Sequence, residues 1–186
     1  MKVLAFSGSL RRDSYNTKLL RAAEELLPPA VELELYEGLK EIPPYDEDDD
    51  GDAAPARVTE LRRAVANADA ILIATPEYNS SIPGQLKNAL DWVSRPIATN
   101  TLRYKPVAVV GASTGAFGAV WSQAELRKVL AAIGARVIEG DVAVGHAPTR
   151  FDEDGSLIDL ELREQLGEVV DALLAETNGA ARLVAA

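Results

Sequence analysis

Gly8-Ser9-Leu10-Arg11-Arg12-Asp13-Ser14-Tyr15-Asn16 and Thr75-Pro76-Glu77-Tyr78-Asn79-Ser80-Ser81-Ile82-Pro83-Gly84 are the two segments that decide the fold. Each segment follows a short apolar run and precedes a helical pattern. A strand, a polar loop and a helix in succession are typical of open α/β folds, which bind their ligands at the carboxyl edge of the sheet. We therefore expect both segments to lie at one edge of a parallel sheet, where they can share a ligand.

The rest of the chain alternates between short apolar runs and longer amphipathic stretches. Five runs rich in β-branched residues predict strands at Lys2–Ser7, Ala30–Tyr36, Ala70–Thr75, Pro106–Gly111 and Arg136–Val144. Three apolar stripes at helical spacing can cover the sheet: Leu19, Leu20, Ala23, Leu26 and Leu27; Leu126, Val129, Leu130 and Ile133; and Leu162, Leu166, Val169, Val170 and Leu173. This alternation predicts an α/β fold with a flavodoxin-like, doubly wound sheet of five parallel strands in the order 2-1-3-4-5.

A single domain is the simplest expectation for 186 residues. We expect it to span residues 1–176, with a frayed tail at residues 177–186 and a surface loop in the acidic, proline-containing segment Ile42–Pro55. No run approaches the roughly 18 apolar residues of a membrane-spanning helix, and Met1–Phe6 is too short for the core of a signal peptide. These features predict a cytoplasmic protein.

The composition narrows the classes of function. The formal net charge of −10 opposes attraction to nucleic acid or to an anionic membrane, so we expect neither as a partner. The chain has no cysteine, which excludes disulfides, thiolate catalysis and thiolate metal sites. Redox chemistry would therefore come from a bound cofactor, and an anionic ligand would need a local positive site.

The first quoted segment offers such a positive site. A phosphate group can be held by backbone N–H groups at a helix N-terminus together with hydroxyl and guanidinium donors. The candidate donors are the side chains of Ser9, Arg11, Ser14 and Asn16. Alternatively, Ser14 or Asn16 only caps the helix and Arg11 is solvated. Neither G-x-G-x-x-G nor G-x-x-x-x-G-K-[ST] occurs, so a mononucleotide fits better than a dinucleotide or a P-loop nucleotide.

The second segment suits a planar ring. Pro76 constrains the exit from the predicted third strand, and Glu77 follows it. Tyr78 offers an aromatic face, and Asn79 can donate and accept hydrogen bonds at a ring edge. The alternative is a plain turn that leads into the helix predicted at Gln85–Ser94.

A third loop follows the predicted fourth strand. Segment Gly111–Gly118 is rich in glycine, so its backbone can approach a ligand closely, and it carries Ser113, Thr114 and Gly115. Loops after strands one, three and four meet at one sheet edge in the expected topology. The three loops together therefore predict one ligand site.

We discount two features that suggest metals. Residues 46–51 reproduce the opening of a calcium-binding loop, but position twelve of that loop is Arg57 instead of glutamate, and Pro55 interrupts it. His146 is the only histidine, and without cysteine a conventional zinc site is not expected. We therefore predict no metal site.

The two quoted segments, with Leu86–Trp92 after them, resemble the flavin site of the NADPH-dependent FMN reductase family, which includes quinone, chromate and azo-dye reductases. The resemblance covers residues 1–175. It implies that the FMN phosphate is held by Ser9, Arg11, Ser14 and Asn16. It also implies that the ribityl chain and isoalloxazine are bordered by Pro76, Glu77, Tyr78 and Asn79, with Ser113, Thr114 and Gly115 on the other side of the ring.

The same resemblance implies an enzyme in which NADPH or NADH reduces bound FMN and a small-molecule electron acceptor then takes the electrons. It implies no catalytic side chain, and it implies a homodimer or homotetramer in which the helix at Leu86–Trp92 lies near a partner subunit. Trp92 alternatively belongs to the core. Trp121 and Ala124 stand where the chromate-reducing branch carries an arginine and a tyrosine linked to its oligomer contacts, so the substrate and tetramer of that branch are not implied.

Two other functions are compatible with the sequence. A flavodoxin-like electron carrier would bind FMN on the same fold without oxidising NAD(P)H. A non-redox mononucleotide-binding or scaffold protein would take up no flavin. The sequence leaves open the choice between NADPH and NADH, and it does not identify the physiological acceptor among quinones, free flavins, metal oxyanions and azo compounds.

Overall fold

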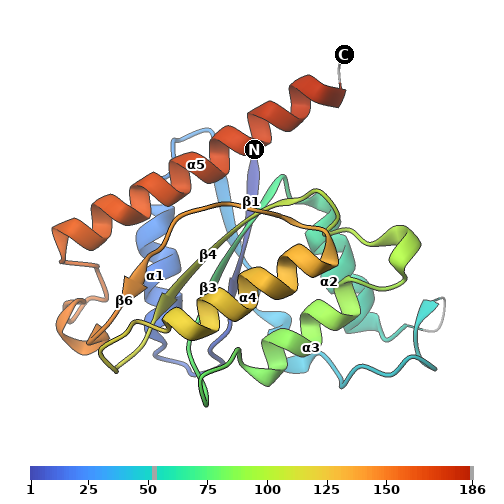
Figure 1. The fold of residues 1–186 in the computed structure, drawn as a ribbon, viewed down its shortest axis with the longest axis horizontal. Coiled ribbons are helices and arrows are strands. Elements are labelled where there is room, and N and C mark those ends of the chain that lie inside the picture. Colours follow the sequence, from blue (N-terminus) through green and yellow to red (C-terminus); the bar gives the residue numbers. More distant parts are fainter. Residues whose placement is uncertain (52–53, 185–186) are drawn as a thin grey trace.

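The sheet of the computed structural model, which describes residues 1–51 and 54–184, has the predicted strand order β2-β1-β3-β4-β5. Its strands are all paired in parallel and comprise β1 (Lys2–Ser7), β2 (Glu32–Leu35), β3 (Ala70–Thr75), β4 (Pro106–Ala112), β5 (Arg136–Val137) and β6 (Ala143–Val144). The strands run from the top toward the bottom of Figure 1, so the loops after β1, β3 and β4 lie together at its lower edge. The predicted α/β class and the meeting of the three loops are confirmed.

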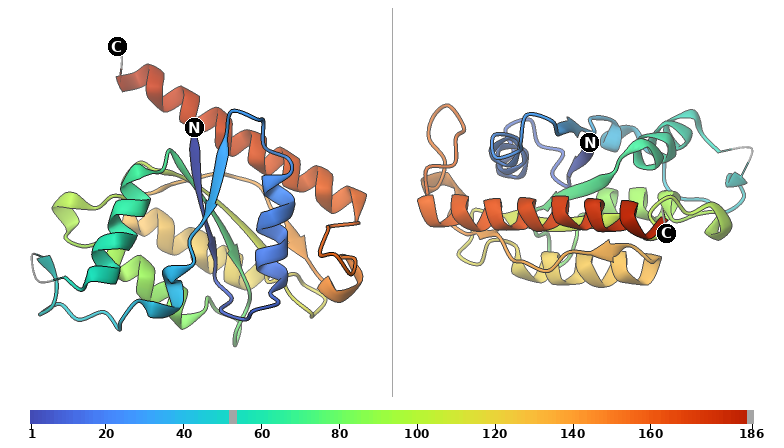
Figure 2. Two further views of the ribbon diagram at one scale, coloured as in Figure 1. Left: turned by 180° about the vertical axis from the view of Figure 1, so that it is seen from behind. Right: turned by 90° about the horizontal axis from the view of Figure 1, so that it is seen from above.

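Helices cover both faces of the sheet. The described residues form α1 (Tyr15–Glu24), α2 (Ala56–Asn67), α3 (Gly84–Val93), α4 (Val120–Ile133) and α5 (Leu160–Val184), with short 3₁₀ turns at η1 (Gly38–Glu41), η3 (Ile97–Thr99) and η4 (Ala147–Thr149). One hydrophobic core joins α1 and α5 to one face, and a second core joins α2, α3 and α4 to the other. Seen from behind, β2 lies at the sheet edge between α1 and α2 (Figure 2).

Each strand contributes to both cores, because neighbouring residues of a strand point to opposite faces of the sheet. On β3, Leu72 lies in the core with α1 and α5, whereas Ile71 and Ile73 lie in the core with the other three helices. Every residue of β3 and β4 is buried, as expected for central strands of a parallel sheet. Trp92 is fully buried in the second core, which confirms the interpretation of this residue as core.

The prediction of one continuous fifth strand at Arg136–Val144 is wrong, because this segment forms two short strands. Val137 in β5 pairs with Val107, and Ala143 in β6 pairs with Gly111, so the segment between them has two more residues than the stretch of β4 that it faces. The sheet therefore has six strands instead of the predicted five.

A side chain from α4 stabilises this interruption. The extra residues bulge at Gly140, which has a φ of 132°. Arg127 donates a hydrogen bond to the Gly140 carbonyl at 2.6 Å and pairs with Asp141 at 3.0 Å. The break in the strand therefore depends on a contact between segments that are not adjacent in the sequence.

The ends of the predicted domain can be compared with the structure in part. The described part of Ile42–Pro55 is a loop without α-helix or β-strand, as predicted, and residues 52 and 53 lie outside the described residues. Helix α5 continues through most of the predicted tail to Val184, and residues 185 and 186 are not described. Fraying of the tail and the domain boundary at residue 176 stay predictions. Within residues 1–51 and 54–184, no helix combines the length and hydropathy needed to cross a bilayer.

Candidate active site

A cavity of about 250 Å³ opens at the carboxyl edge of the sheet. Its lining comes from the three predicted loops: Ser9, Arg11, Ser14, Tyr15 and Asn16 from the first, Pro76, Glu77 and Tyr78 from the second, and Ala112, Ser113 and Thr114 from the third. The structure thus brings most of the predicted site residues around one space. Asn79 and Gly115 belong to the same loops but lie outside this lining.

Ser14 and Asn16 both make hydrogen bonds within the protein. The Ser14 Oγ accepts from the backbone N–H groups of Asn16 (3.2 Å) and Thr17 (3.4 Å), so the capping role considered for Ser14 is confirmed. The buried Asn16 amide donates to the Ala112 carbonyl at 2.9 Å, and its Oδ1 accepts from the Ala112 N–H at 3.0 Å. Asn16 therefore ties the first loop to the end of β4. The Ser14 hydroxyl hydrogen and the second Asn16 amide hydrogen remain for a ligand.

Arg11 carries the positive charge of the site. Its guanidinium lies 5.5 Å from the centroid of the Tyr15 ring, within the range of a cation–π contact, and no carboxylate among the described residues pairs with it. Lys18, whose amino group is 5.2 Å from the same ring centroid, is paired with Asp13 at 2.8 Å. The hydrogen bond from Lys18 lowers the pKa of the Asp13 carboxyl. Of these two cations, only Arg11 is left for an external anion.

The backbone around Arg11 adds further donors. No acceptor within the described part of the chain takes a hydrogen bond from the N–H groups of residues 10–13. The N-terminus of α1 follows directly, and its first turn has no acidic residue that would oppose an anion. Free N–H groups, a helix N-terminus and a guanidinium together provide the chemistry that binds phosphate.

The second loop is a tight turn that places Tyr78 at the cavity. Tyr78 and Ser81 each donate a backbone hydrogen bond to the other's carbonyl at 3.1 Å. Asn79 and Ser80 between them have positive φ values of 54° and 60°, which is the geometry of a type I′ turn. Asn79 therefore lies at the tip of the turn, a position that asparagine tolerates. Its contact with a ring edge stays a prediction.

Glu77 connects the second loop to α4. Its Oε2 accepts hydrogen bonds from the N–H groups of Trp121 (3.2 Å) and Ser122 (3.3 Å). The N-cap residue of α4 is Ala119, whose side chain has no acceptor, so Glu77 supplies the missing acceptor and a negative charge at the helix N-terminus. The Thr75 hydroxyl adds a buried hydrogen bond to the Ser122 hydroxyl at 2.9 Å. The Glu77 carboxylate is therefore used in holding the loop to α4.

The third loop is held by close backbone contacts. A Cβ added to Gly118 would lie 2.2 Å from the Ala143 carbonyl carbon, and one added to Gly145 would lie 2.1 Å from the Ala116 carbonyl oxygen. Only glycine allows the loop and the β6 segment to approach so closely. The Ser113 N–H also donates to β6, at 3.0 Å. This wall of the cavity is therefore closely packed against the β6 segment.

Two lining residues, Tyr15 and Ala112, lie outside the predicted set. Tyr15 stands within the first quoted segment, but its ring packs against the ring of Phe151, which is far along the chain. The two ring centroids are 5.7 Å apart. Ala112 is the last residue of β4, one position beyond the predicted end of that strand. The backbone of Ala112 therefore reaches the cavity as the end of the strand, one residue before the predicted Ser113.

The segments discounted as metal sites are engaged in the fold. Asp50 pairs with Arg62 at 2.6 Å, and although burial alone would raise the pKa of Asp50, the hydrogen bonds from Arg62 and the Gly51 N–H lower it. His146 lies at the start of η4 with a φ of 50°. The described residues contain no group of three or more histidine, cysteine, aspartate or glutamate side chains placed to share a metal ion.

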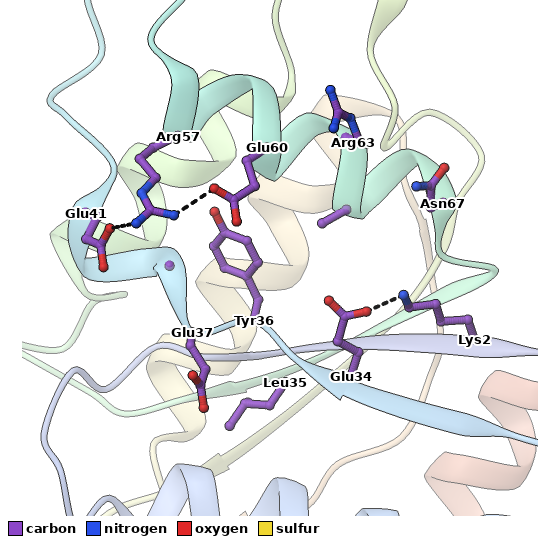
Figure 3. Close-up of a pocket in the computed structure, with 12 residues that line it drawn as sticks. Lys2, Glu34, Leu35, Tyr36, Glu37, Glu41, Arg57, Glu60, Arg63 and Asn67 are labelled. Atoms are coloured by element: carbon purple, nitrogen blue, oxygen red, sulfur yellow. Dashed lines mark hydrogen bonds and ion pairs between the residues drawn. The ribbon is translucent and has the colours of Figure 1, made fainter.

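A second cavity, of about 550 Å³, lies between β2 and α2 (Figure 3). Most of its charged side chains pair with one another: Arg57 with Glu41 and Glu60, and Lys2 with Glu34. These pairs neutralise one another's charge and use their donors. Arg63 also lines this cavity and has no carboxylate partner among the described residues. Most charges of the larger cavity are therefore neutralised, whereas the smaller cavity combines Arg11 with free backbone N–H groups and the N-terminus of α1.

Residues 1–149 match the family model described as NADPH-dependent FMN reductase. The chain belongs to this family. An NAD(P)H-dependent FMN reductase of Pseudomonas aeruginosa is 41% identical over 174 residues, which is 93% of this chain and 93% of the relative. A 2-hydroxy-1,4-benzoquinone reductase of a Burkholderia species is 36% identical over 172 residues, 92% of this chain and 93% of the relative.

A solved structure supports the same assignment. FerB of Paracoccus denitrificans, a flavoenzyme NAD(P)H:(acceptor) oxidoreductase, superposes with a TM-score of 0.84 at 34% identity, over 96% of this chain and 97% of FerB. The family predicted from the two quoted segments is confirmed. All three loops that line the smaller cavity lie inside the matched residues 1–149.

Proposed function

We propose that the protein is an FMN-dependent NAD(P)H oxidoreductase that passes electrons to quinones, flavins or similar small acceptors. The donor set around Arg11 carries the proposal, because an unpaired guanidinium, free N–H groups and a helix N-terminus lie together at the sheet edge. Family membership supports FMN as the anion that these donors bind. The names of the FMN and quinone reductases similar to this chain support the choice of acceptors.

The residues of the site fit the parts of FMN. The phosphate would be held by Ser9, Arg11, Ser14 and Asn16. Charge-assisted hydrogen bonds from Arg11 would contribute most, about 1.5–3 kcal/mol. The ribityl chain and ring would be bordered by Pro76, Glu77, Tyr78, Asn79, Ser113, Thr114 and Gly115.

When bound, FMN supplies two-electron redox chemistry between NAD(P)H and the acceptor. The chain's own residues bind and position, and we assign none of them as a nucleophile or a general acid. Glu77 supports this assignment, because both N–H groups that it accepts from belong to α4 and its carboxylate is a structural cap. The protein side of catalysis is therefore the arrangement of the three loops.

The proposal includes the assembly and location of the protein. We infer a single domain over residues 1–176 that forms a homodimer or homotetramer, as expected for the family. We place it in the cytoplasm, where NAD(P)H is supplied. Light scattering after size-exclusion chromatography measures the assembly directly.

A visible spectrum of the purified protein tests the function. We expect bound flavin absorbance, rapid bleaching by NADPH or NADH without oxygen, and return of the colour when a quinone is added. A yellow protein that neither nicotinamide bleaches would instead be an electron carrier. A colourless protein that takes up no added FMN would refute the proposal. A steady-state screen of acceptors with both nicotinamides then identifies the preferred pair.

A further inference from the structure

Two side-chain hydroxyls at the base of the first loop are linked by hydrogen bonds. The Thr17 hydroxyl, in the first turn of α1, donates to the Ser7 Oγ at 3.0 Å. Ser7 is the last residue of β1, and its hydroxyl donates in turn to the Ser9 carbonyl at 3.2 Å. Each hydroxyl has a single hydrogen to donate, so the three groups form one ordered chain. We call Ser7 and Thr17 the loop clasp.

The loop clasp joins the two ends of the first loop. Ser7 lies where the chain leaves the sheet, and Thr17 lies where it has entered α1. Beside the clasp, the Gly8 N–H donates to the Ala74 carbonyl of β3 at 2.8 Å. The ends of the loop are therefore fixed, whereas the N–H groups of residues 10–13 between them find no acceptor in the described part of the chain.

The hydrogen bond to Ser9 fixes the direction of one peptide group. The Ser9 carbonyl and the Leu10 N–H belong to the same peptide unit, which is planar. This peptide is trans, so its carbonyl and its N–H point in opposite directions. Because Ser7 holds the carbonyl, the Leu10 N–H is turned away from the end of β1. It is one of the free donors of the loop.

We propose that Ser7 and Thr17 are positioning residues for the phosphate group of FMN. The inference rests on the proposed function and adds to it, because neither residue lines the cavity and both hydroxyl hydrogens are used within the protein. By holding the Ser9 carbonyl, the loop clasp orients the Leu10 N–H before the anion binds. A donor that is already oriented binds more tightly, because less conformational freedom is lost on binding.

Thr17→Val tests the proposal, because valine has nearly the shape of threonine and lacks its hydroxyl. We expect the Kd for FMN, measured by flavin fluorescence quenching with the flavin-free protein, to rise about 5-fold. Riboflavin has no phosphate, so its Kd should change less than about twofold. Thr17→Ser keeps the hydroxyl and should bring the FMN affinity back to within about twofold of wild type.

Ser7→Ala removes both hydrogen bonds of the loop clasp, so we expect a rise of about 10-fold in the Kd for FMN. Adding Thr17→Val to Ser7→Ala should cause no further loss, because the Thr17 hydroxyl acts only through Ser7. Thr59→Val is the matched control. Thr59 is exposed in the first turn of α2, and its hydroxyl makes no hydrogen bond to another described residue, so this variant should leave the Kd for FMN unchanged.

Three results would overturn the proposal. Unchanged FMN affinity in Thr17→Val is the first. Equal losses for FMN and riboflavin are the second, because they would assign the loop clasp to the stability of the whole site. A further loss of FMN affinity when Thr17→Val is added to Ser7→Ala is the third, because Thr17 would then act independently. Urea denaturation of each flavin-free variant verifies that it is folded during the titration.

Inorganic phosphate separates this inference from the proposed function. In NMR spectra of the flavin-free, isotope-labelled protein, phosphate should shift the Leu10 amide resonance, and Thr17→Val should weaken this binding about 5-fold. A wild-type protein that takes up no flavin but shows this shift would refute the function and retain the loop clasp. A Leu10 amide that does not respond to phosphate would overturn the inference, whether or not flavin binds.

Discussion

The cavity between β2 and α2 is more than twice as large as the cavity at the carboxyl edge of the sheet, about 550 Å³ against about 250 Å³, yet its chemistry is less suited to an anion. In the larger cavity, Arg57 and Lys2 are paired with carboxylates, whereas Arg63 has no carboxylate partner among the described residues (Figure 3). In the smaller cavity, the guanidinium of Arg11 has no carboxylate partner among the described residues. The smaller cavity is distinguished as the candidate ligand site by free backbone N–H groups and the N-terminus of α1 beside Arg11, and not by its volume.

The topology explains the difference. The smaller cavity lies where the first, third and fourth strands end, so the N-terminus of α1 and three loops converge on it. The larger cavity lies beside β2, an edge strand, where acidic and basic side chains of one surface meet one another. Substitutions of matched residues in the two cavities test this contrast.

Gly118→Ala should have the largest effect. The added Cβ would lie 2.2 Å from the backbone of Ala143, and the residue has a φ of 57°. We expect the free energy of unfolding to fall by at least about 3 kcal/mol in urea denaturation. Gly38→Ala is the counterpart in the larger cavity, where the obstacle is the end of the Tyr36 side chain at 2.8 Å. Because a side chain can shift, that loss should be smaller, and equal losses would contradict the idea of a specially close-packed site wall.

Asn16→Ala should have the next largest effect. The change removes two hydrogen bonds to Ala112 and leaves the N–H and carbonyl of that buried residue without partners. We expect a loss of about 2–3 kcal/mol in the free energy of unfolding, measured by urea or heat. Asn67→Ala in the larger cavity is the control, because Asn67 is exposed and alanine favours the helix, so it should change stability by less than about 0.5 kcal/mol. If the Asn16–Ala112 hydrogen bonds mattered only for ligand binding, Asn16→Ala and Asn67→Ala would have the same free energy of unfolding.

Arg11→Ala should weaken FMN binding by about 10- to 100-fold, because it removes the charge-assisted hydrogen bonds to the phosphate. Quenching of flavin fluorescence on titration with the flavin-free protein measures this affinity. Arg11→Lys keeps the charge but loses the planar fork, so an intermediate affinity is expected. Arg63→Ala removes an exposed guanidinium from the larger cavity and should change FMN affinity by less than twofold. Full retention of flavin by Arg11→Ala would overturn the phosphate assignment.

The sequence predicts the features of this fold that depend on local patterns. The strands β1 and β3 begin and end where the apolar runs do, and the polar loops after them reach the same sheet edge. Their side-chain identities also indicate phosphate chemistry, because hydroxyl, amide and guanidinium groups occur close together after a strand. These signals lie within a few residues of one another, so they can be read without the structure.

The remaining features depend on residues far apart in the sequence. The break in the segment Arg136–Val144 is held by Arg127 of α4. Glu77 caps α4 across 44 positions of sequence, and Asn16 bonds to Ala112 across 96. No local pattern distinguishes such structural bonds from ligand contacts, so the sequence predicts which residues surround the site but not how each side chain is used.

Tyr36→Phe changes a lining residue of the larger cavity and should have the smallest effect on the free energy of unfolding at neutral pH. The Tyr36 hydroxyl is buried and has no hydrogen-bond partner among the described residues, so its removal should change the free energy of unfolding by no more than about 1 kcal/mol at pH 7. Burial raises the pKa of Tyr36 to about 12, which means that the folded state favours the neutral phenol.

The same variant gives a pH dependence of known sign. An unfolded tyrosine ionises near pH 10, so the wild-type protein should lose stability as the pH rises from about 10 to 12, and Tyr36→Phe should lack this component. Denaturation at pH 8 and pH 11 should show a relative gain of about 1 kcal/mol for the phenylalanine variant. A variant less stable than wild type by more than about 1 kcal/mol at pH 7 would mean that the hydroxyl has a partner in solution. The larger cavity would then also contain a satisfied polar site, and the contrast with the smaller cavity would rest on charge alone.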